Sequence, residues 1–143
     1  MTLKYESSES PADDDVAYLR KHLRAYNRAQ AGDELPHQHI AVYARDESET
    51  IVGGATGEVT WGWLYVEMLW VHEDHRNHGV GSLLMTKIED LAREYNVVGF
   101  HLGTTSFQAL DFYLKCGYEV WGQLPDFPPG HINYSLRKLN RDR

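Results

Sequence analysis

The sequence predicts a mixed α/β (α+β) fold, with a central sheet of six or seven strands and helices on both faces. Segments rich in apolar and β-branched residues alternate with segments whose apolar residues recur at helical spacing. In the second half, the order strand, helix, strand, helix, strand indicates parallel pairing at the centre of the sheet. Because the chain has 143 residues and no internal repeat, we expect one domain, 1–143.

Three strands should follow an N-terminal amphipathic helix. Ser10 as N-cap and Pro11 in the first helical position form a capping box that should start the helix, and Gly32 should end it. Its apolar face consists of Ala12, Val16, Leu19, Leu23 and Tyr26. Residues 39–45 and 50–59 should pair antiparallel, and the aromatic, branched segment 64–71 should be a central strand.

The second half should contain two helices and three strands. A helix should run from Gly81 to about Asn96, with Glu89 and Arg93 as an i,i+4 ion pair on its outer face. The other predicted elements are a strand at 97–102, a helix at 107–116, and strands at 118–123 and 132–138.

Charge and composition narrow the class of protein. With 21 acidic and 14 basic residues the net charge is −7, which disfavours nucleic acid as a partner. No apolar run approaches the roughly 20 residues that span a membrane. The first ten residues do not resemble a secretory signal, and the single Cys116 excludes an internal disulfide. We therefore expect a cytoplasmic protein that binds neither nucleic acid nor membrane.

The segment between the third strand and the following helix predicts an anion site. It reads HEDHRNHGVGSLL (72–84), in which a strand end, a glycine-containing turn and a helix start follow in order. Free N–H groups at a helix N-terminus bind anions, and glycines let a phosphate approach the backbone. The plainer interpretation is a tight turn that uses Gly79 and Gly81 only for their backbone freedom.

Other phosphate and metal motifs fit this segment less well. A P-loop needs a lysine between Gly81 and Ser82, and a Rossmann fingerprint needs a third glycine at Leu84. The spacing of His72, His75 and His78 does not match a helical zinc motif, so we expect no metal.

Two motifs together resemble the GCN5-related N-acetyltransferase (GNAT) family. Arg76-Asn77-His78-Gly79-Val80-Gly81 matches the family's Arg/Gln-x-x-Gly-x-Gly/Ala hallmark. About thirty residues downstream, SFQALDFYLKCGYEV (106–120) resembles its Ala-x-x-Phe/Leu-Tyr-x-Lys-x-Gly-Phe signature. The resemblance covers about residues 51–138.

The resemblance implies an acyl-CoA N-acyltransferase fold, splayed at its centre between strands 64–71 and 97–102, with acetyl-CoA as co-substrate. The pyrophosphate would bind amides between Arg76 and Ser82, and the pantetheine arm would pair with the backbone around Leu69 and Val71. The implied cofactor-binding residues are Leu69, Trp70, Val71, Arg76, Asn77, His78, Gly79, Val80, Gly81 and Ser82.

Catalytic residues also follow from the resemblance. Tyr113 corresponds to the family's tyrosine acid. Because a phenol has a pKa of about 10 and a thiol about 8.5, we expect it to donate a hydrogen bond to the leaving thiolate; core packing is the alternative. The base is either Glu67, on the strand before the cofactor turn, or His131, whose Pro-Pro-Gly-His context resembles glyphosate-type acetyltransferases.

An aromatic acceptor pocket formed by Trp61, Trp63 and Phe127 is as compatible with the sequence as plain core packing. Ser106 stands where the family often has asparagine. We expect an enzyme that transfers acetyl to the primary amine of a small molecule by direct attack in a ternary complex, with homodimer formation left open. The alternatives are a non-catalytic acyl-CoA-binding module, acetylation of protein N-termini or lysines, and an unrelated nucleotide-phosphate binder.

Overall fold

The computed structural model describes residues 1–32 and 35–143. Contacts divide the chain into two units, Met1–Glu34 and Leu35–Arg143, each of which is described by itself. That residues 1–143 act as one domain therefore stays a prediction. Within the described residues, no helix is both long and apolar enough to cross a bilayer.

The first unit contains helix α1, Asp13–Ala31. The predicted capping box is wrong, because the N-cap is Ala12 and no side chain caps the helix. Three aspartates, Asp13–Asp15, occupy the first turn instead, where negative charge is favourable toward the helix dipole. The helix ends as predicted at Gly32, which has a φ of 82° and donates its N–H to the carbonyl of Arg28 at 2.9 Å.

The second unit is built on a mixed six-stranded sheet in the order β1-β2-β3-β4-β6-β5, which confirms the predicted fold class. Its strands are β1 Gln38–Arg45, β2 Ile51–Thr60, β3 Trp63–Val71, β4 Gly99–Thr105, β5 Glu119–Pro125 and β6 Ile132–Leu139. Its helices are the 3-10 turn η1 Glu73–His75, α2 Val80–Arg93 and α3 Leu110–Lys115. Only β3 and β4 pair in parallel, so the parallel centre is confirmed and the flanks are antiparallel.

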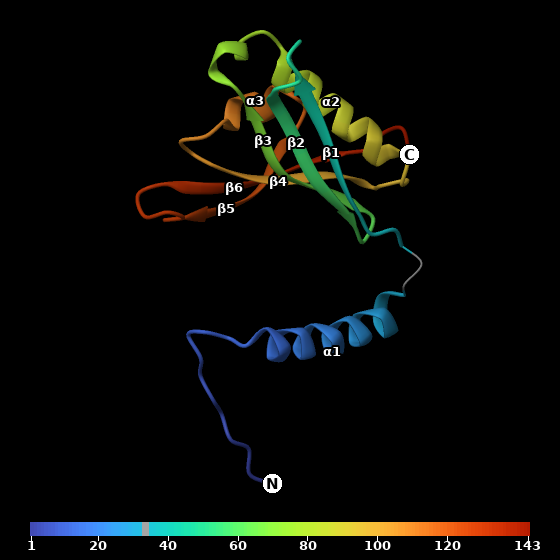
Figure 1. Ribbon diagram of the computed structural model, residues 1–143, viewed down its shortest axis with the longest axis vertical. Coiled ribbons are helices and arrows are strands. Elements are labelled where there is room, and N and C mark those ends of the chain that lie inside the picture. Colours follow the sequence, from blue (N-terminus) through green and yellow to red (C-terminus); the bar gives the residue numbers. More distant parts are fainter. Residues whose placement is uncertain (33–34) are drawn as a thin grey trace. The chain divides into compact units, whose positions relative to one another are not determined.

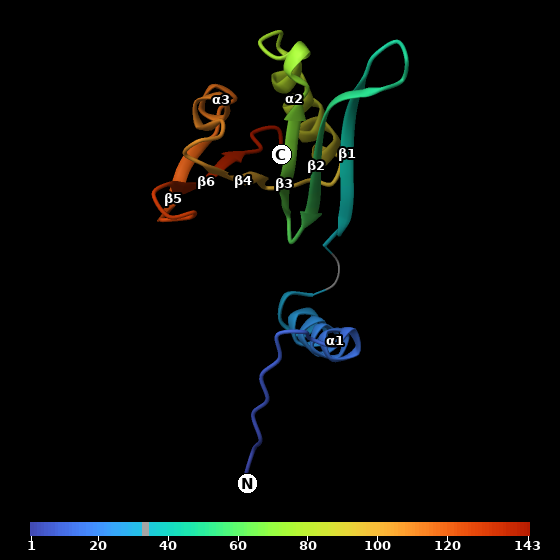
Figure 2. The same ribbon diagram turned by 60° about the vertical axis from the view of Figure 1, so that its left-hand side comes forward.

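The sheet splays open between β3 and β4. These strands pair only where Trp63–Tyr65 lies beside Gly99–His101, although β3 continues to Val71 and β4 to Thr105. In both Figure 1 and Figure 2, β4, β5 and β6 turn away steeply from β1, β2 and β3. Beyond Tyr65, β3 therefore has no partner strand on its β4 side, and its backbone groups on that side are available for another molecule.

A β-bulge in β3 changes which side chains face outward. Thr56 lies opposite Met68 and Gly57 opposite Val66, so Glu67 is the extra residue. Leu64 and Val66 are buried, whereas Glu67 and Met68 are both exposed. Glu67 follows the buried Val66 and so points to the sheet face that α2 does not cover, and the bulge exposes the next side chain, Met68, as well.

Helix α2 packs against β1, β2 and β3 and supplies much of the core. Beneath α2, Gly57 allows β2 and β3 to pack closely, because a Cβ there would lie 2.7 Å from the carbonyl oxygen of Tyr65 and 2.8 Å from the side chain of Leu64. The apolar α2 residues Leu84, Met85, Ile88 and Ala92 are buried. These residues recur at intervals of one, three and four, which places them on one face of the helix.

The predicted ion pair between Glu89 and Arg93 is wrong. Glu89 is only 3% exposed, accepts a hydrogen bond from the Tyr118 hydroxyl at 2.7 Å and pairs with Lys138 Nζ at 2.9 Å. Arg93 pairs instead with Asp90 at 2.5 Å. Glu89 follows Met85 by four residues and precedes Ala92 by three, so it lies on the buried face of the helix. Its buried carboxylate is stabilised there by Tyr118 and Lys138.

Candidate active site

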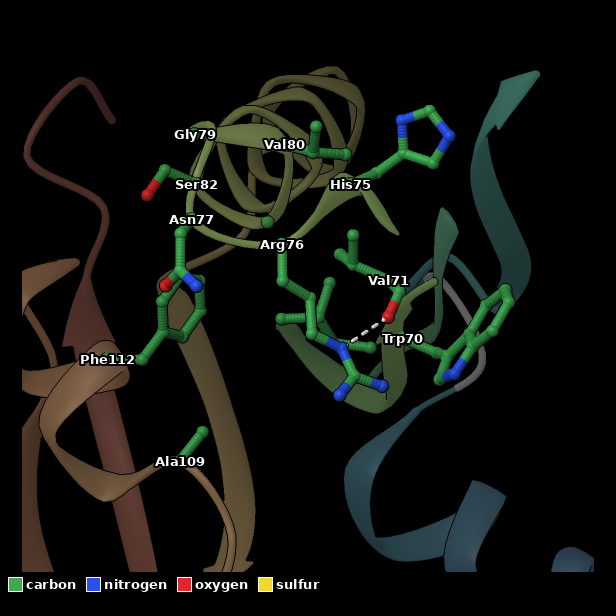
Figure 3. Close-up of a pocket in the computed structure, with 12 residues that line it drawn as sticks. Trp70, Val71, His75, Arg76, Asn77, Gly79, Val80, Ser82, Ala109 and Phe112 are labelled. Carbon is green, nitrogen blue, oxygen red and sulfur yellow. Dashed lines mark hydrogen bonds between the residues drawn. The ribbon is translucent and has the colours of Figure 1, made fainter. Parts of the chain in front are cut away.

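A cavity of about 540 Å³ lies where β3 ends and α2 begins (Figure 3). Nine of the ten predicted cofactor-binding residues line it, and His78 is the exception. The lining residues are Leu69, Trp70, Val71, His75, Arg76, Asn77, Gly79, Val80, Gly81, Ser82, Ala109 and Phe112. The structure therefore brings the end of β3, the following loop and the start of α2 around one space.

The loop before α2 holds an open helix N-terminus toward this cavity. Asn77 and Gly79 have φ values of 63° and 80°, in the left-handed region that asparagine and glycine tolerate best. Gly79 is the N-cap of α2 and offers no side chain to cap it. The N–H groups of the first turn are thus left for a bound anion.

The charge around this N-terminus is locally positive. Arg76 donates from Nε to the carbonyl of Val71 at 2.9 Å, drawn as the dashed line in Figure 3, which holds its guanidinium beside the cavity. His75 also lines the cavity, and none of the twelve described lining residues is acidic. In a chain with net charge −7, this is a local site suited to a phosphate group.

Helix α3 closes the cavity from the other side. A Cβ built on Gly81 would lie 3.2 Å from the Phe112 ring, so the start of α2 and α3 are in close contact. Ala109 and Phe112 line the cavity although they were not predicted as cofactor residues. The sequence signal for both residues is their position in the second GNAT-like motif (106–120), because this motif packs beside the first motif (76–81) in the folded chain.

Glu67 stands on the outer sheet face near the point where β3 and β4 separate. Its side chain is 39% exposed, and its Oε1 lies 3.9 Å from His39 Nδ1. It is two residues beyond Tyr65, the last β3 residue that pairs with β4. At about 3.3 Å per residue, Glu67 is roughly 7 Å along the strand from the closed end of the opening.

His131 lies at the opposite, wide end of the opening. Its Nδ1 is 3.4 Å from Ser106 Oγ, and its ring packs edge-on against Phe107 at 4.9 Å. Ser106 Oγ also accepts the N–H of Ile132 at 3.2 Å. Ser106 thus joins the loop after β4 to the start of β6 and orients His131, and it does not line the cofactor cavity.

Tyr113 projects from α3 into an aromatic cluster. Its ring centroid lies 5.1 Å from that of Phe112 and 6.1 Å from that of Tyr118. Burial, and secondarily the charge of Cys116, raise the pKa of the Tyr113 hydroxyl. Within the described part of the chain this hydroxyl makes no hydrogen bond, so it remains a neutral donor for an incoming group.

The three predicted acceptor residues do not form one pocket. Trp61 and Trp63 line a second cavity of about 550 Å³ at the start of β3, together with Thr60, His101, Trp121 and Arg137. Phe127 does not line it, because Phe127 belongs to the turn between β5 and β6 and not to the middle of those strands.

Potential metal ligands gather elsewhere. Donor atoms of His37, His39 and Glu58 lie within 4.8 Å of one another on β1, β2 and the residue preceding β1. Within residues 1–32 and 35–143, His72, His75 and His78 do not form such a group. The expectation that the protein uses no metal stays a prediction.

Comparison with known proteins identifies the family. The family model described as "Acetyltransferase (GNAT) family" matches residues 4–118. The chain belongs to the GNAT family of acetyltransferases. It is 38% identical over 117 residues to blasticidin-S acetyltransferase of Streptomyces morookaense, covering 81% of this chain and 86% of that relative.

Solved structures agree with this assignment. A crystal structure of an acetyltransferase from Bacillus cereus ATCC 14579 has a TM-score of 0.87 and 31% identity, covering 94% of this chain and 98% of that one. An aminoglycoside 6′-N-acetyltransferase complexed with coenzyme A shares the fold at a TM-score of 0.65 and 20% identity, covering 91% and 95% of the two chains. The GNAT fold and an acetyltransferase activity, both predicted from the sequence, are confirmed.

Proposed function

We propose that this GNAT acetyltransferase uses acetyl-CoA and transfers the acetyl group to the primary amine of a small molecule within a ternary complex. One observation carries the proposal: the cavity at the α2 N-terminus adjoins the unpaired edge of β3, which runs to the closed end of the opening. Val71 is six residues from Tyr65, so an extended arm along this edge would cover about 20 Å.

The pyrophosphate would accept hydrogen bonds from the first-turn amides of α2, beside Arg76. The pantetheine arm would pair with the backbone of β3 near Leu69 and Val71, on the side without a partner strand. Two observations support a small-molecule acceptor: the second cavity has the volume of a small-ligand site, and a relative is named for its action on the small molecule blasticidin S.

The reaction needs a neutral amine, a stabilised oxyanion and a hydrogen bond to the leaving thiolate. Glu67 takes the ammonium proton, and the amine nitrogen then attacks the thioester carbonyl, forming the C–N bond. A β3 amide that faces the opening stabilises the oxyanion. The C–S bond breaks as the oxyanion re-forms the carbonyl, and the Tyr113 hydroxyl donates a hydrogen bond to the departing thiolate. The nitrogen of the new amide releases its second proton to solvent, and solvent protonates the thiolate.

We favour Glu67 over His131 as the base because Glu67 lies nearer the closed end of the opening. Ser106 follows β4 five residues after His101, the last β4 residue paired with β3, so His131 beside it is roughly 17 Å along the strand from that end. Glu67→Gln should lower kcat/KM about 100-fold, because the carboxylate that takes the ammonium proton is then absent. The His131→Ala variant is the matched comparison, and a loss of this size in His131→Ala alone would reverse the assignment.

Thiol release from acetyl-CoA, measured over classes of amines and checked by the mass of the acetylated product, tests the function itself. Acetylation of small amines supports it. Acetylation confined to peptide N-termini or lysines would replace the small-molecule acceptor. Titration calorimetry in which free nucleotides bind and acetyl-CoA does not would overturn the proposal.

A further inference from the structure

The cavity at the start of β3 lies on the sheet face opposite α2. Leu64, Phe100 and Leu136 are buried in the core that α2 helps to form. Because successive strand residues point to opposite faces, their neighbours Trp63, His101 and Arg137 point outward. Trp61 and Trp121, each 60% exposed, complete the wall with Thr60. Three indole rings and an imidazole thus border about 550 Å³.

Two of the aromatic walls, Trp63 and His101, are fixed relative to one another. The Trp63 and His101 rings meet edge to face, with centroids 5.8 Å apart and planes at 88°. The Tyr65 ring supports the same imidazole at 5.0 Å. Rigid aromatic walls with exposed faces are suited to stacking a planar ring, since little side-chain freedom is lost on binding.

Arg137 and His101, two of the polar groups that line the cavity, favour a neutral ring over a cation. Arg137 Nε donates to Glu119 at 3.1 Å, and no other hydrogen bond of its guanidinium is found in the described residues. Its remaining N–H groups can donate to a carbonyl oxygen. Burial lowers the pKa of His101, so its neutral imidazole offers one donor and one acceptor. The positive charge of Arg137 also disfavours binding of an ammonium group in this cavity. The cavity therefore differs from the aromatic cages that bind cations.

The cavity adjoins the proposed reaction centre. His101 pairs with Tyr65 at the last paired position before β3 and β4 separate. Glu67 lies two residues beyond Tyr65 and four beyond Trp63, or roughly 7 to 13 Å along the strand. If a molecule binds with its ring in the cavity, a group about 10 Å from that ring would lie beside Glu67.

We propose that the cavity formed by Thr60, Trp61, Trp63, His101, Trp121 and Arg137 is the acceptor subsite for a planar, oxo-substituted heteroaromatic ring. The substrate is then a primary amine whose nitrogen lies about 10 Å from such a ring. The identification of the reacting amine rests on the proposed function, whereas the ring site is defined by the cavity alone.

A series of N1-(aminoalkyl)uracils with spacers of about two to eight methylenes tests the proposal. The matched controls are the same amines built on 5,6-dihydrouracil, which keeps the carbonyl groups and loses the planar ring. We expect kcat/KM to peak at an intermediate or long spacer and to be about 10-fold higher for the uracil amines, a difference typical of ring stacking. If kcat/KM is the same for the uracil and the dihydrouracil amines at every spacer length, the proposed ring subsite is wrong.

Variants on one hairpin locate the effect. Trp121→Ala should raise KM for the uracil amines about 10-fold with kcat unchanged, and Trp121→Phe should restore most of the loss. A short aliphatic amine should be unaffected by either change. Leu124→Ala, an exposed position on the same strand that does not line the cavity, should behave as the parent enzyme. A Trp121→Ala enzyme with unchanged KM for the uracil amines would contradict the proposal.

A binding experiment separates failure of this inference from failure of the proposed function. 1-Methyluracil has no amine and needs no acetyl-CoA. Its binding, followed by the indole N–H signals in NMR spectra, should shift Trp63 and Trp121 in the parent protein. If amines are acetylated but 1-methyluracil shifts no indole signal, the subsite is wrong and the function stands. If 1-methyluracil binds and no amine is acetylated, the ring site stands and the function is wrong.

Discussion

The two ends of β3 carry two cavities of similar volume that are built in different ways. At the Val71 end the walls come mainly from one contiguous stretch, and its distinguishing parts are backbone groups: the left-handed turn at Asn77 and Gly79 and the open α2 N-terminus. At the Trp63 end the walls are side chains brought together from β2, β3, β4, β5 and β6 or their ends. Backbone geometry therefore defines the cofactor end, and side-chain identity defines the aromatic end.

The largest expected effect comes from the buried charge that fixes α2 to the sheet. Glu89→Ala removes the partner of both Lys138 and Tyr118 and leaves the Lys138 charge, whose side chain is 28% exposed, without its ion pair. We expect the free energy of unfolding in urea to fall by about 3 kcal/mol, the lower end for breaking a buried pair.

Glu119→Ala is the matched control at the aromatic end. The Glu119–Arg137 pair has side-chain exposures of 64% and 47%, so solvent screens it and its loss should cost less than about 1 kcal/mol. If Glu89→Ala and Glu119→Ala lower the free energy of unfolding equally, burial does not make the Glu89–Lys138 pair more stabilising than the exposed Glu119–Arg137 pair.

The second prediction tests whether the cofactor end depends on backbone shape. Gly81→Val introduces a branched side chain where even a Cβ would lie 3.2 Å from the Phe112 ring. We expect the Kd for acetyl-CoA to rise about 100-fold in calorimetric titrations, or about 2.7 kcal/mol. In Gly122→Val, a β5 position where a Cβ meets only Ser135 at 3.8 Å, the Kd should not change. An unchanged Kd in Gly81→Val would place the cofactor elsewhere.

The same difference explains how much could be predicted from the sequence. Residues 76–82 are contiguous and needed only a strand end, glycines and a helix start to be recognised, and six of these seven line the cavity. Nothing in the local sequence of Trp121, His101 and Arg137 places them beside Trp63, so they could not be predicted. The β3–β4, β4–β6 and β5–β6 pairings bring them there. Phe127 was included in the acceptor pocket because of its aromatic character, which says nothing about position.

Errors in the element assignment have equally local causes. Ser10 and Pro11 have the residue types of a capping box, but the helix starts later, at Asp13. The acidic residue type of Glu89 favours the outer face, whereas its spacing from Met85 and Ala92 indicates the buried face. At this position the helical period is a better guide to burial than the residue type.

The third prediction concerns the α3 hydroxyl that we propose assists the leaving thiolate. Tyr113→Phe removes a hydroxyl that has no hydrogen-bond partner in the described residues, so stability should change little. We expect kcat to fall about 10-fold with the Kd for acetyl-CoA unchanged, since the hydrogen bond forms only as the thiolate develops. Tyr118→Phe, which removes the hydroxyl bonded to Glu89, should instead lower stability by about 1 to 3 kcal/mol and leave kcat unchanged. Unchanged turnover in Tyr113→Phe would make Tyr113 a packing residue.

The smallest expected effect is a pH dependence at the aromatic end. Burial holds the pKa of His101 below its usual 6.5, so the folded state binds fewer protons than the unfolded state as the pH falls. The stability associated with neutral His101 is thus fully present above pH 6.5 and is lost progressively toward the lowered pKa. His101→Phe keeps a ring beside Trp63 and removes the titration, so its free energy of unfolding should fall less between pH 7.5 and 5.5 than that of the parent. Trp121→Phe changes the same cavity without removing a titrating group and should keep the parent's full pH dependence. If His101→Phe loses as much stability on acidification as the parent, burial of this imidazole does not contribute to the pH dependence of folding.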